Sequence, residues 1–452
     1  MITEKLDRSK KPIPGAPRDV KFPGYFEATL PNGINVIVIK DEKFPIVSAR
    51  FVFKAGSFFD GEKYGISSFT SEMLTKGTQS RSALEIAELV DYHGAFLSSG
   101  CDFDATFVSC YSLKKYFEKI FDITSEVILK PAFAEDEINR LREQKINSII
   151  SYKDEGDYLA SRIYKKNIYH KLPYSKPLEG TESILNSLQK NDLENFYNTN
   201  YKPDNLIIAF VGDIDEARAV QLVEEKFGSF TGKFVNNTVA EDEHLNPEKK
   251  VYIVKKPGAV QSSLKVGHLA FKRNIPDYIP ASVMNTLLGG SFTSRINKNL
   301  REVNGFTYGA RSFFDWKKYS GDFAVETEVG NSFTAPAVKE MLFEINKMKN
   351  EYVSDEELTS VKNYLTGNFP LQLETPNAIA SKVISLKIYD IEKDYYNTYI
   401  SKVNAVTKQD INDVAMKYLH PEKVTIAVGG NPDEIKEDMK QFGDVEVFDD
   451  VE

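Results

Sequence analysis

The chain has 452 residues, which is too long for one hydrophobic core, so at least two domains are expected. Apolar residues make up 41% of it and aromatic residues 12%, which excludes a chain that is disordered throughout. The net charge of -9 argues against nucleic acid as a partner, since nucleic-acid binding needs a basic face.

The N-terminal segment is polar and proline-containing, and it predicts an extended arm over residues 1–24. It lacks the apolar core of a secretory signal, and no apolar run approaches the ~20 residues that span a bilayer. We therefore expect no membrane partner and a cytoplasmic protein, or a periplasmic one if a signal peptide has been removed. With only two cysteines in the chain, disulfides are not expected to hold the fold together.

Apolar residues predict strands over 34–39 and 47–53, followed by a helix over 66–74. Residues 65–78 read GISSFTSEMLTKGT, and this segment resembles the zinc helix of the pitrilysin/insulinase peptidases, with their inverted His-x-x-Glu-His motif. Further short motifs similar to that family recur along nearly the whole chain: TLPNG ending at Gly33, PAF ending at Phe133, PY ending at Tyr174 and GD starting at Gly212. The branch that the chain resembles includes the bacterial enzymes and the mitochondrial processing peptidase, in which two such chains close like a clam shell.

The resemblance also shows which residues of the zinc site have changed. In the family two histidines and a distal glutamate bind zinc, and the glutamate between the histidines activates a water. Ser68 and Glu72 stand at the histidine positions, Ser71 at the catalytic glutamate and Ser148 at the distal glutamate. Serine is a poor zinc ligand and no general base at neutral pH, and one carboxylate does not make a zinc site. We therefore predict no metal and no catalytic residue of its own in this chain.

No other pattern in the sequence predicts a replacement metal site. The five histidines are too far apart for any two to share a helix face. One alternative groups His93 with Cys101 and Cys110, although that cysteine spacing fits no common zinc motif. The other interpretation places His93 in a helix-end turn before Gly94 and both cysteines in or beside a strand.

The sequence contains an internal repeat, which fixes the architecture. The segments around Ala209 and Ala427 repeat a Pro-containing turn and an apolar run at a constant spacing. The sequence SFTS at 68–71 recurs at 291–294 with a spacing only a few residues longer. We therefore predict an α+β fold with two homologous lobes that arose by duplication, each a mostly antiparallel sheet covered by helices.

The lobe boundaries follow from the polar stretch 232–249. The first lobe is expected over 25–235 and contains the degenerate zinc motif. The second lobe is expected over 250–452.

In the second lobe, residues 295–304 predict a helix that ends at Gly305, with a strand from Phe306 onward. Arg301 in the last helical turn and Tyr308 early in the strand can then project toward one point. An alternative from the residues alone is that Arg301 caps the helix and Tyr308 lies half-buried on the sheet. The sequence LREVNGFTY is similar to the Arg/Tyr pair of the family. The resemblance implies that this pair binds the substrate backbone and the oxyanion at the zinc site of the facing lobe.

These expectations together predict a non-catalytic subunit of a heterodimeric zinc peptidase. The resemblance implies a homologous partner with an intact His-x-x-Glu-His motif that holds the zinc, and a peptide or unfolded segment as substrate. Gly289 and Gly290 either form a loop that helps to admit substrate or only let the backbone turn. Two alternatives remain open: a structural protein like the core subunits of the respiratory cytochrome complex, and a homodimeric peptide-binding protein.

Overall fold

The computed structural model describes residues 20–235, 245–246 and 248–452. Most of the predicted N-terminal arm, and residues 236–244 and 247 of the polar stretch, lie outside the described residues. Among the described residues, no helix is both long enough and apolar enough to cross a membrane.

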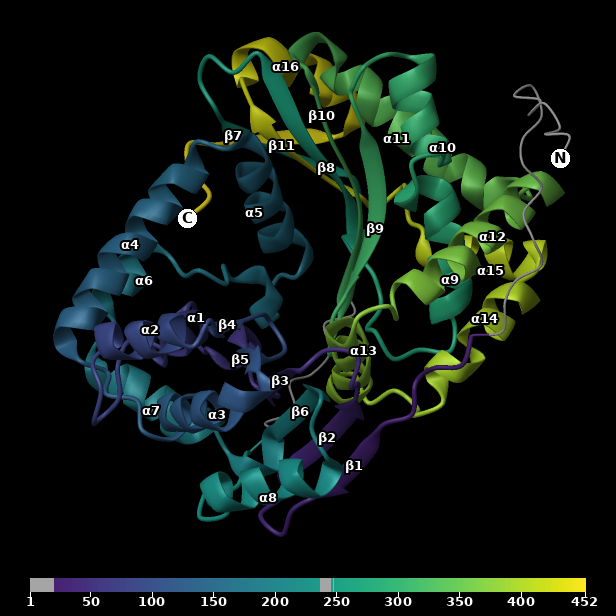
Figure 1. Cartoon of the computed structure of the whole chain (residues 1–452). Coiled ribbons are helices and arrows are strands. Elements are labelled where there is room, and N and C mark those ends of the chain that lie inside the picture. Colours follow the sequence, from purple (N-terminus) through teal and green to yellow (C-terminus); the bar gives the residue numbers. More distant parts are fainter. Residues whose placement is uncertain (1–19, 236–244, 247) are drawn as a thin grey trace, which may run out of the picture.

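Two six-stranded sheets form the centre of the molecule, one from each half of the chain (Figure 1). The first sheet has the order β1-β2-β6-β3-β5-β4, and its strands are β1 (Phe26–Thr29), β2 (Asn35–Lys40), β3 (Ile46–Phe53), β4 (Phe96–Cys101), β5 (Thr106–Leu113) and β6 (Leu206–Gly212). The second has the order β12-β7-β11-β8-β10-β9, and its strands are β7 (Lys250–Lys255), β8 (Gln261–Leu269), β9 (Ala310–Trp316), β10 (Gly321–Gly330), β11 (Thr425–Gly430) and β12 (Asp444–Phe448). Most neighbouring strands are antiparallel, which confirms the predicted α+β fold.

Helices cover both sheets. Those in the first half are α1 (Ile66–Met73), α2 (Ala83–Tyr92), α3 (Lys114–Leu129), α4 (Glu135–Lys153), α5 (Gly156–Ile168), α6 (Glu182–Ser187), α7 (Lys190–Asn200) and α8 (Glu216–Phe227). Those in the second half are α9 (Tyr278–Asn285), α10 (Arg295–Asn297), α11 (Thr334–Asn350), α12 (Asp355–Leu371), α13 (Pro376–Ile388), α14 (Tyr395–Ala405), α15 (Lys408–Tyr418) and α16 (Pro432–Met439).

Shorter helical segments complete the chain. Two are π-helical and extend the helices before them, η4 (Thr286–Gly290) and η5 (Lys298–Val303). Five are 3-10 turns: η1 (Ser57–Phe59), η2 (Pro173–Ser175), η3 (Pro203–Asn205), η6 (Asn331–Phe333) and η7 (Lys440–Phe442).

The register of the two sheets confirms the duplication. Strands β4, β5, β3 and β6 of the first sheet occupy the same places as β9, β10, β8 and β11 of the second. One row of directly paired residues crosses these four strands in each sheet: Ser98, Ser109, Arg50 and Ala209 in the first, and Arg311, Glu326, Lys265 and Ala427 in the second. The predicted equivalence of Ala209 and Ala427 is therefore confirmed. The predicted equivalence of 68–71 with 291–294 is wrong, because the first lies inside α1 and the second in the loop between η4 and α10. By its place after β8, the counterpart of α1 is α9, and the shared SFTS letters are a local coincidence.

The two halves exchange one helix each. Helix α5 of the first half packs on the second sheet, where Leu159 and Tyr164 join a core that contains Val254 and Ala427. Helix α13 of the second half packs in turn on β2 and β6 of the first sheet (Figure 1). Both faces of β6 are thereby covered, which explains why all its residues are apolar or glycine and buried.

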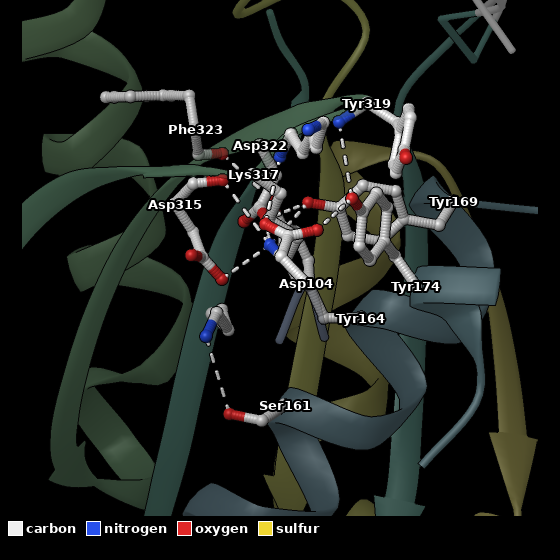
Figure 2. A network of polar contacts seen from close by, with 12 residues as sticks. Asp104, Ser161, Tyr164, Tyr169, Tyr174, Asp315, Lys317, Tyr319, Asp322 and Phe323 are labelled. Carbon is white, nitrogen blue, oxygen red and sulfur yellow. Dashed lines mark hydrogen bonds and ion pairs between the residues drawn. The ribbon is translucent and has the colours of Figure 1, made fainter. Parts of the chain in front are cut away.

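A buried polar network also joins the lobes (Figure 2). Tyr169 donates its hydroxyl proton to Asp322 on β10, and the Lys317 ammonium lies 2.9 Å from the same hydroxyl oxygen. Tyr174 donates to Asp104 at 2.7 Å, and this carboxylate also accepts the backbone N–H of Lys318 at 3.0 Å. The turn between β9 and β10 is thus fastened to the first lobe by groups that water does not reach.

Candidate functional site

The helix expected to carry a zinc motif is built as predicted. Gly65 precedes α1 with φ of 92°, and a Cβ at this position would lie 2.6 Å from the backbone of Gly180. Asp60 accepts the N–H groups of Gly65 at 2.7 Å and Ser67 at 3.1 Å, and so satisfies the first orphan donors of the helix. Burial raises the pKa of the Asp60 carboxyl to about 7.

A lysine contacts the two residues of α1 that stand at the expected histidine positions, Ser68 and Glu72. Ser68 and Glu72 lie one turn apart on α1, and Lys145 of α4 donates to both, at 2.9 Å and 2.5 Å. The Lys145 side chain is only 11% exposed, so its ammonium is held between the two helices. The site therefore already contains a positive charge paired with Glu72.

The other two predicted positions make only local contacts. The Ser71 hydroxyl donates to the backbone carbonyl of Ser68 at 2.8 Å. Ser148 is exposed and donates to the carbonyl of Gln144 at 3.0 Å. The four positions hence offer one carboxylate and three hydroxyls beside an ammonium, a set that does not fit zinc. Within the described residues, no group of three or more His, Cys, Asp and Glu side chains is arranged to hold a metal ion.

The alternative site at His93 is not built either. The imidazole Nδ1 of His93 lies 2.7 Å from the carbonyl oxygen of Leu89. His93 is the C-cap of α2, which agrees with the expected helix-end turn before Gly94. Cys101 and Cys110 lie on the neighbouring strands β4 and β5. Burial raises the pKa of Cys101 to about 12 and that of Cys110 to about 11, so neither thiol is a ready thiolate.

The second predicted site lies at the end of the helix formed by α10 and η5. This helix runs from Arg295 to Val303, and Gly305 follows its C-cap with φ of 67°, as predicted. The expected strand from Phe306 is wrong in its start, because β9 begins only at Ala310. Residues 306–309 form a turn instead, in which the N–H of Gly309 is bonded to the Thr307 hydroxyl at 3.2 Å.

The two side chains of the pair point away from the core of their lobe. Tyr308 is 97% exposed, so it is not half-buried on the sheet. The guanidinium carbon of Arg301 lies 4.5 Å from the centre of the Phe292 ring, and no hydrogen bond or ion pair of Arg301 is found in the described part of the chain. The arrangement leaves five guanidinium N–H donors and one phenolic donor available to a ligand.

The two glycines before this helix have a packing role. A Cβ on Gly289 would lie 2.5 Å from the backbone nitrogen of Ser312, so η4 approaches β9 closely only with glycine there. A Cβ on Gly290 would lie 3.0 Å from the amide of Asn285. The close contact between η4 and β9 therefore accounts for the glycine at position 289.

The one residue of these sites that sequence reasoning missed is Lys145. It precedes Ser148 by one turn of α4, and the signal available was a lysine on the helix face predicted to supply the distal ligand.

Comparison with known proteins gives two family models that together match more than half of the chain. The model described as Insulinase (Peptidase family M16) matches residues 35–182, and the model described as Peptidase M16 inactive domain matches residues 187–365. An uncharacterized zinc protease, YmxG of Bacillus subtilis, is 25% identical over 88% of this chain and 97% of its own length. A protein named non-peptidase homolog YmxG, from Helicobacter pylori, is 19% identical over 88% of this chain and 92% of its own.

Solved structures share the fold. A peptidase M16 inactive domain from Pseudomonas fluorescens superposes with a TM-score of 0.84 at 23% identity, covering 90% of this chain and 98% of that one. A protease from Helicobacter pylori superposes with a TM-score of 0.80 at 18% identity, covering 91% of this chain and 100% of that one.

Proposed function

The chain belongs to the insulinase (M16) peptidase family as an inactive-type member, and we propose that it is the non-catalytic subunit of a heterodimeric zinc peptidase. Its partner would be a homologous chain with an intact His-x-x-Glu-His helix, and the zinc would be held there. This chain would supply Arg301 and Tyr308 to the partner's site.

The observation that carries the proposal is the contrast between the two sites. At the first, Lys145 and Glu72 neutralise each other where a metal would lie. At the second, Tyr308 is almost fully exposed, and the Arg301 guanidinium lies over the Phe292 ring with no hydrogen bond or ion pair to another described residue. A purely structural protein gains nothing from an exposed phenol and an unpaired guanidinium at a helix end.

The chemistry of the pair suits amide hydrolysis at a neighbouring site. A guanidinium presents fixed donors to a peptide carbonyl, and a contact of this kind forms before the reaction begins. The Tyr308 phenol would donate to the negative charge that develops on the scissile carbonyl oxygen. Arg301 therefore contributes to peptide binding, and Tyr308 contributes mainly to turnover.

The substrate would be an extended peptide or an unfolded segment. Among the described strands, β1 and β4 are the edges of the first sheet and β12 and β9 those of the second, so each has one neighbouring strand. An extended peptide pairs with such an edge through its backbone. Strand β9 starts two residues after Tyr308, so a peptide bound along this edge would pass the pair.

Reconstitution tests the proposal. The chain is mixed with a zinc-bearing homologue from the same organism, and cleavage of an unstructured fluorogenic peptide is measured. Activity is expected only in the mixture. Tyr308→Phe should then lower kcat about a hundredfold with dimer formation unchanged, as for loss of one oxyanion donor. Arg301→Ala should raise KM as well.

Matched controls are the exposed Tyr92, as Tyr92→Phe, and Arg140 on α4, as Arg140→Ala, whose side chain is 55% exposed. Neither control should change activity by more than about twofold, since surface substitutions have small effects. Full activity of both Tyr308→Phe and Arg301→Ala in an active mixture would favour a scaffold role instead.

A further inference from the structure

The guanidinium of Arg301 lies over the ring of Phe292. Phe292 lies in the loop between η4 and α10, and its side chain is 66% exposed. The distance of 4.5 Å from the guanidinium carbon to the ring centre is within the range of a cation–π contact. Without this ring, the long Arg301 side chain would have no described contact that selects one rotamer.

A buried amide links the Phe292 loop to the turn that carries Tyr308. Asn297 is only 3% exposed, and its Nδ2 donates to the carbonyl of Phe292 at 2.6 Å. Its Oδ1 accepts the N–H of Ala310, the first residue of β9, at 3.0 Å. One side chain thus fixes the segment beneath Arg301 and the segment just after Tyr308 relative to each other. Figure 1 shows α10 beside β9 at this point.

The turn itself is held by two threonines. The Thr327 hydroxyl of β10 lies 2.9 Å from the Thr307 hydroxyl and donates to the carbonyl of Gly309 at 2.8 Å. Tyr308 lies between these two anchored residues, so its backbone is fixed although its side chain is free. Among the described residues, the Arg301 guanidinium has no comparable hydrogen bond, and Phe292 supplies a ring contact.

From this geometry we infer that Phe292 and Asn297 are positioning residues for the Arg301/Tyr308 pair. Phe292 orients the Arg301 guanidinium through its ring, and Asn297 sets the spacing between the two donors. The inference deepens the proposed function and rests on it where activity is concerned. The orientation of Arg301 by Phe292 concerns this chain alone and can be tested without a partner.

The first experiment measures the reactivity of Arg301 toward phenylglyoxal in the isolated chain, by mass spectrometry of the modified peptide. Phe292→Leu should increase the modification rate of Arg301 about two- to fivefold, the factor that a surface cation–π contact corresponds to. Phe292→Tyr, which keeps the ring, should leave the rate unchanged. Arg140 serves as the internal control, because its side chain is 55% exposed on α4 of the first lobe.

The second experiment uses the reconstituted, active pair of chains. Phe292→Leu should raise KM by a similar factor with kcat little changed, and Phe292→Tyr should restore KM. Asn297→Asp, which removes the donor to the Phe292 carbonyl, should lower kcat as well, because the Tyr308 segment loses its spacing. A double variant Phe292→Leu/Arg301→Ala should be no worse than Arg301→Ala alone.

The outcomes distinguish the positioning role of Phe292 from the proposed function of the Arg301/Tyr308 pair. An unchanged phenylglyoxal rate in Phe292→Leu, or additive effects in the double variant, would overturn the positioning role even if Arg301 proves essential. A changed rate, together with full activity of Arg301→Ala, would leave the positioning intact and refute the proposed function.

Discussion

At the scale of single residues, Lys145 determines the charge and hydrogen bonding of the degenerate zinc motif on α1. Its ammonium donates to both Ser68 and Glu72, so a fixed cation compensates the one carboxylate that remains at the expected ligand positions. A comparison of ligand positions cannot find it, because Lys145 is not a ligand position in the family motif. A lysine on a long helix is normally solvated, and only the packing of α4 on α1 shows that this one is not.

Restoring the zinc ligands should therefore require the removal of Lys145. The substitutions S68H, S71E, E72H and S148E install the family's set, but they also leave the ammonium without its carboxylate partner beside the metal position. Adding Lys145→Ala to these four should allow about one zinc per chain after dialysis, measured by metal analysis. The unmodified chain and Lys145→Ala alone are the controls and should stay well below one. Equal zinc content with and without Lys145 would contradict this role.

Asp60 should make stability depend on pH. Burial raises the pKa of its carboxyl to about 7 in the folded chain, whereas the unfolded value is about 4. Between these values the folded chain retains a proton that the unfolded chain has released, so the free energy of unfolding should fall as pH rises from about 4 to 7. Asp60→Asn should reduce this fall in urea unfolding measured at pH 5 and pH 8, although it also loses one acceptor for the N–H groups at the start of α1.

The free energy of unfolding of Asp60→Asn should still fall with rising pH, because burial also raises the pKa of Asp102, to about 6. Asp449→Asn, at an exposed carboxylate, is the matched control. A pH dependence identical in the Asp60→Asn variant and the unmodified chain would refute the assignment.

At the scale of elements, the sequence predicted the features that depend on neighbouring residues in the chain and missed those that depend on distant ones. The helix ending at Gly305 was predictable because a left-handed C′ position favours glycine. The start of β9 was not, because the turn at 306–309 is held by Thr327 from another strand. The repeat predicted two equivalent sheets, but not the exchange of α5 and α13. Helix α5 is amphipathic, whereas α13 has buried apolar residues around most of its circumference, and neither sequence specifies which of two similar sheets the helix covers.

The exchange depends on one close approach between backbones. A Cβ on Gly429 of β11 would lie 2.1 Å from the carbonyl oxygen of Gly156, where α5 begins. Gly429→Ala should therefore destabilise the chain by about 1–3 kcal/mol, as overpacking does. Gly367→Ala adds the same methyl inside α12, where nothing lies within 4 Å, and should stabilise by up to about 1 kcal/mol. Urea unfolding of both variants measures the difference, and equal midpoints would show that α5 adjusts freely.

At the scale of the whole molecule, the exchanged helices and the buried polar network make each lobe part of the other's core. Neither half can unfold without exposing an inner sheet face of its neighbour, so the two lobes should unfold together. The chain has a single tryptophan, Trp316 on β9, whose fluorescence reports on the second lobe. Hydrogen exchange of the β6 amides, followed by mass spectrometry, reports on the first.

Both probes should give one urea midpoint, which is the criterion for a single cooperative transition. Tyr169→Phe removes the hydroxyl that donates from the first lobe to Asp322 of the second lobe and should lower both midpoints equally. A loss of tryptophan signal at lower urea than the opening of β6 would instead mean two independent lobes. Coupled lobes would hold the turn that carries Tyr308 at a fixed distance from α1, because the hairpin of β9 and β10 is anchored in the first lobe. The position of the Arg301/Tyr308 pair relative to α1 is then a property of the whole fold and not of the second lobe alone.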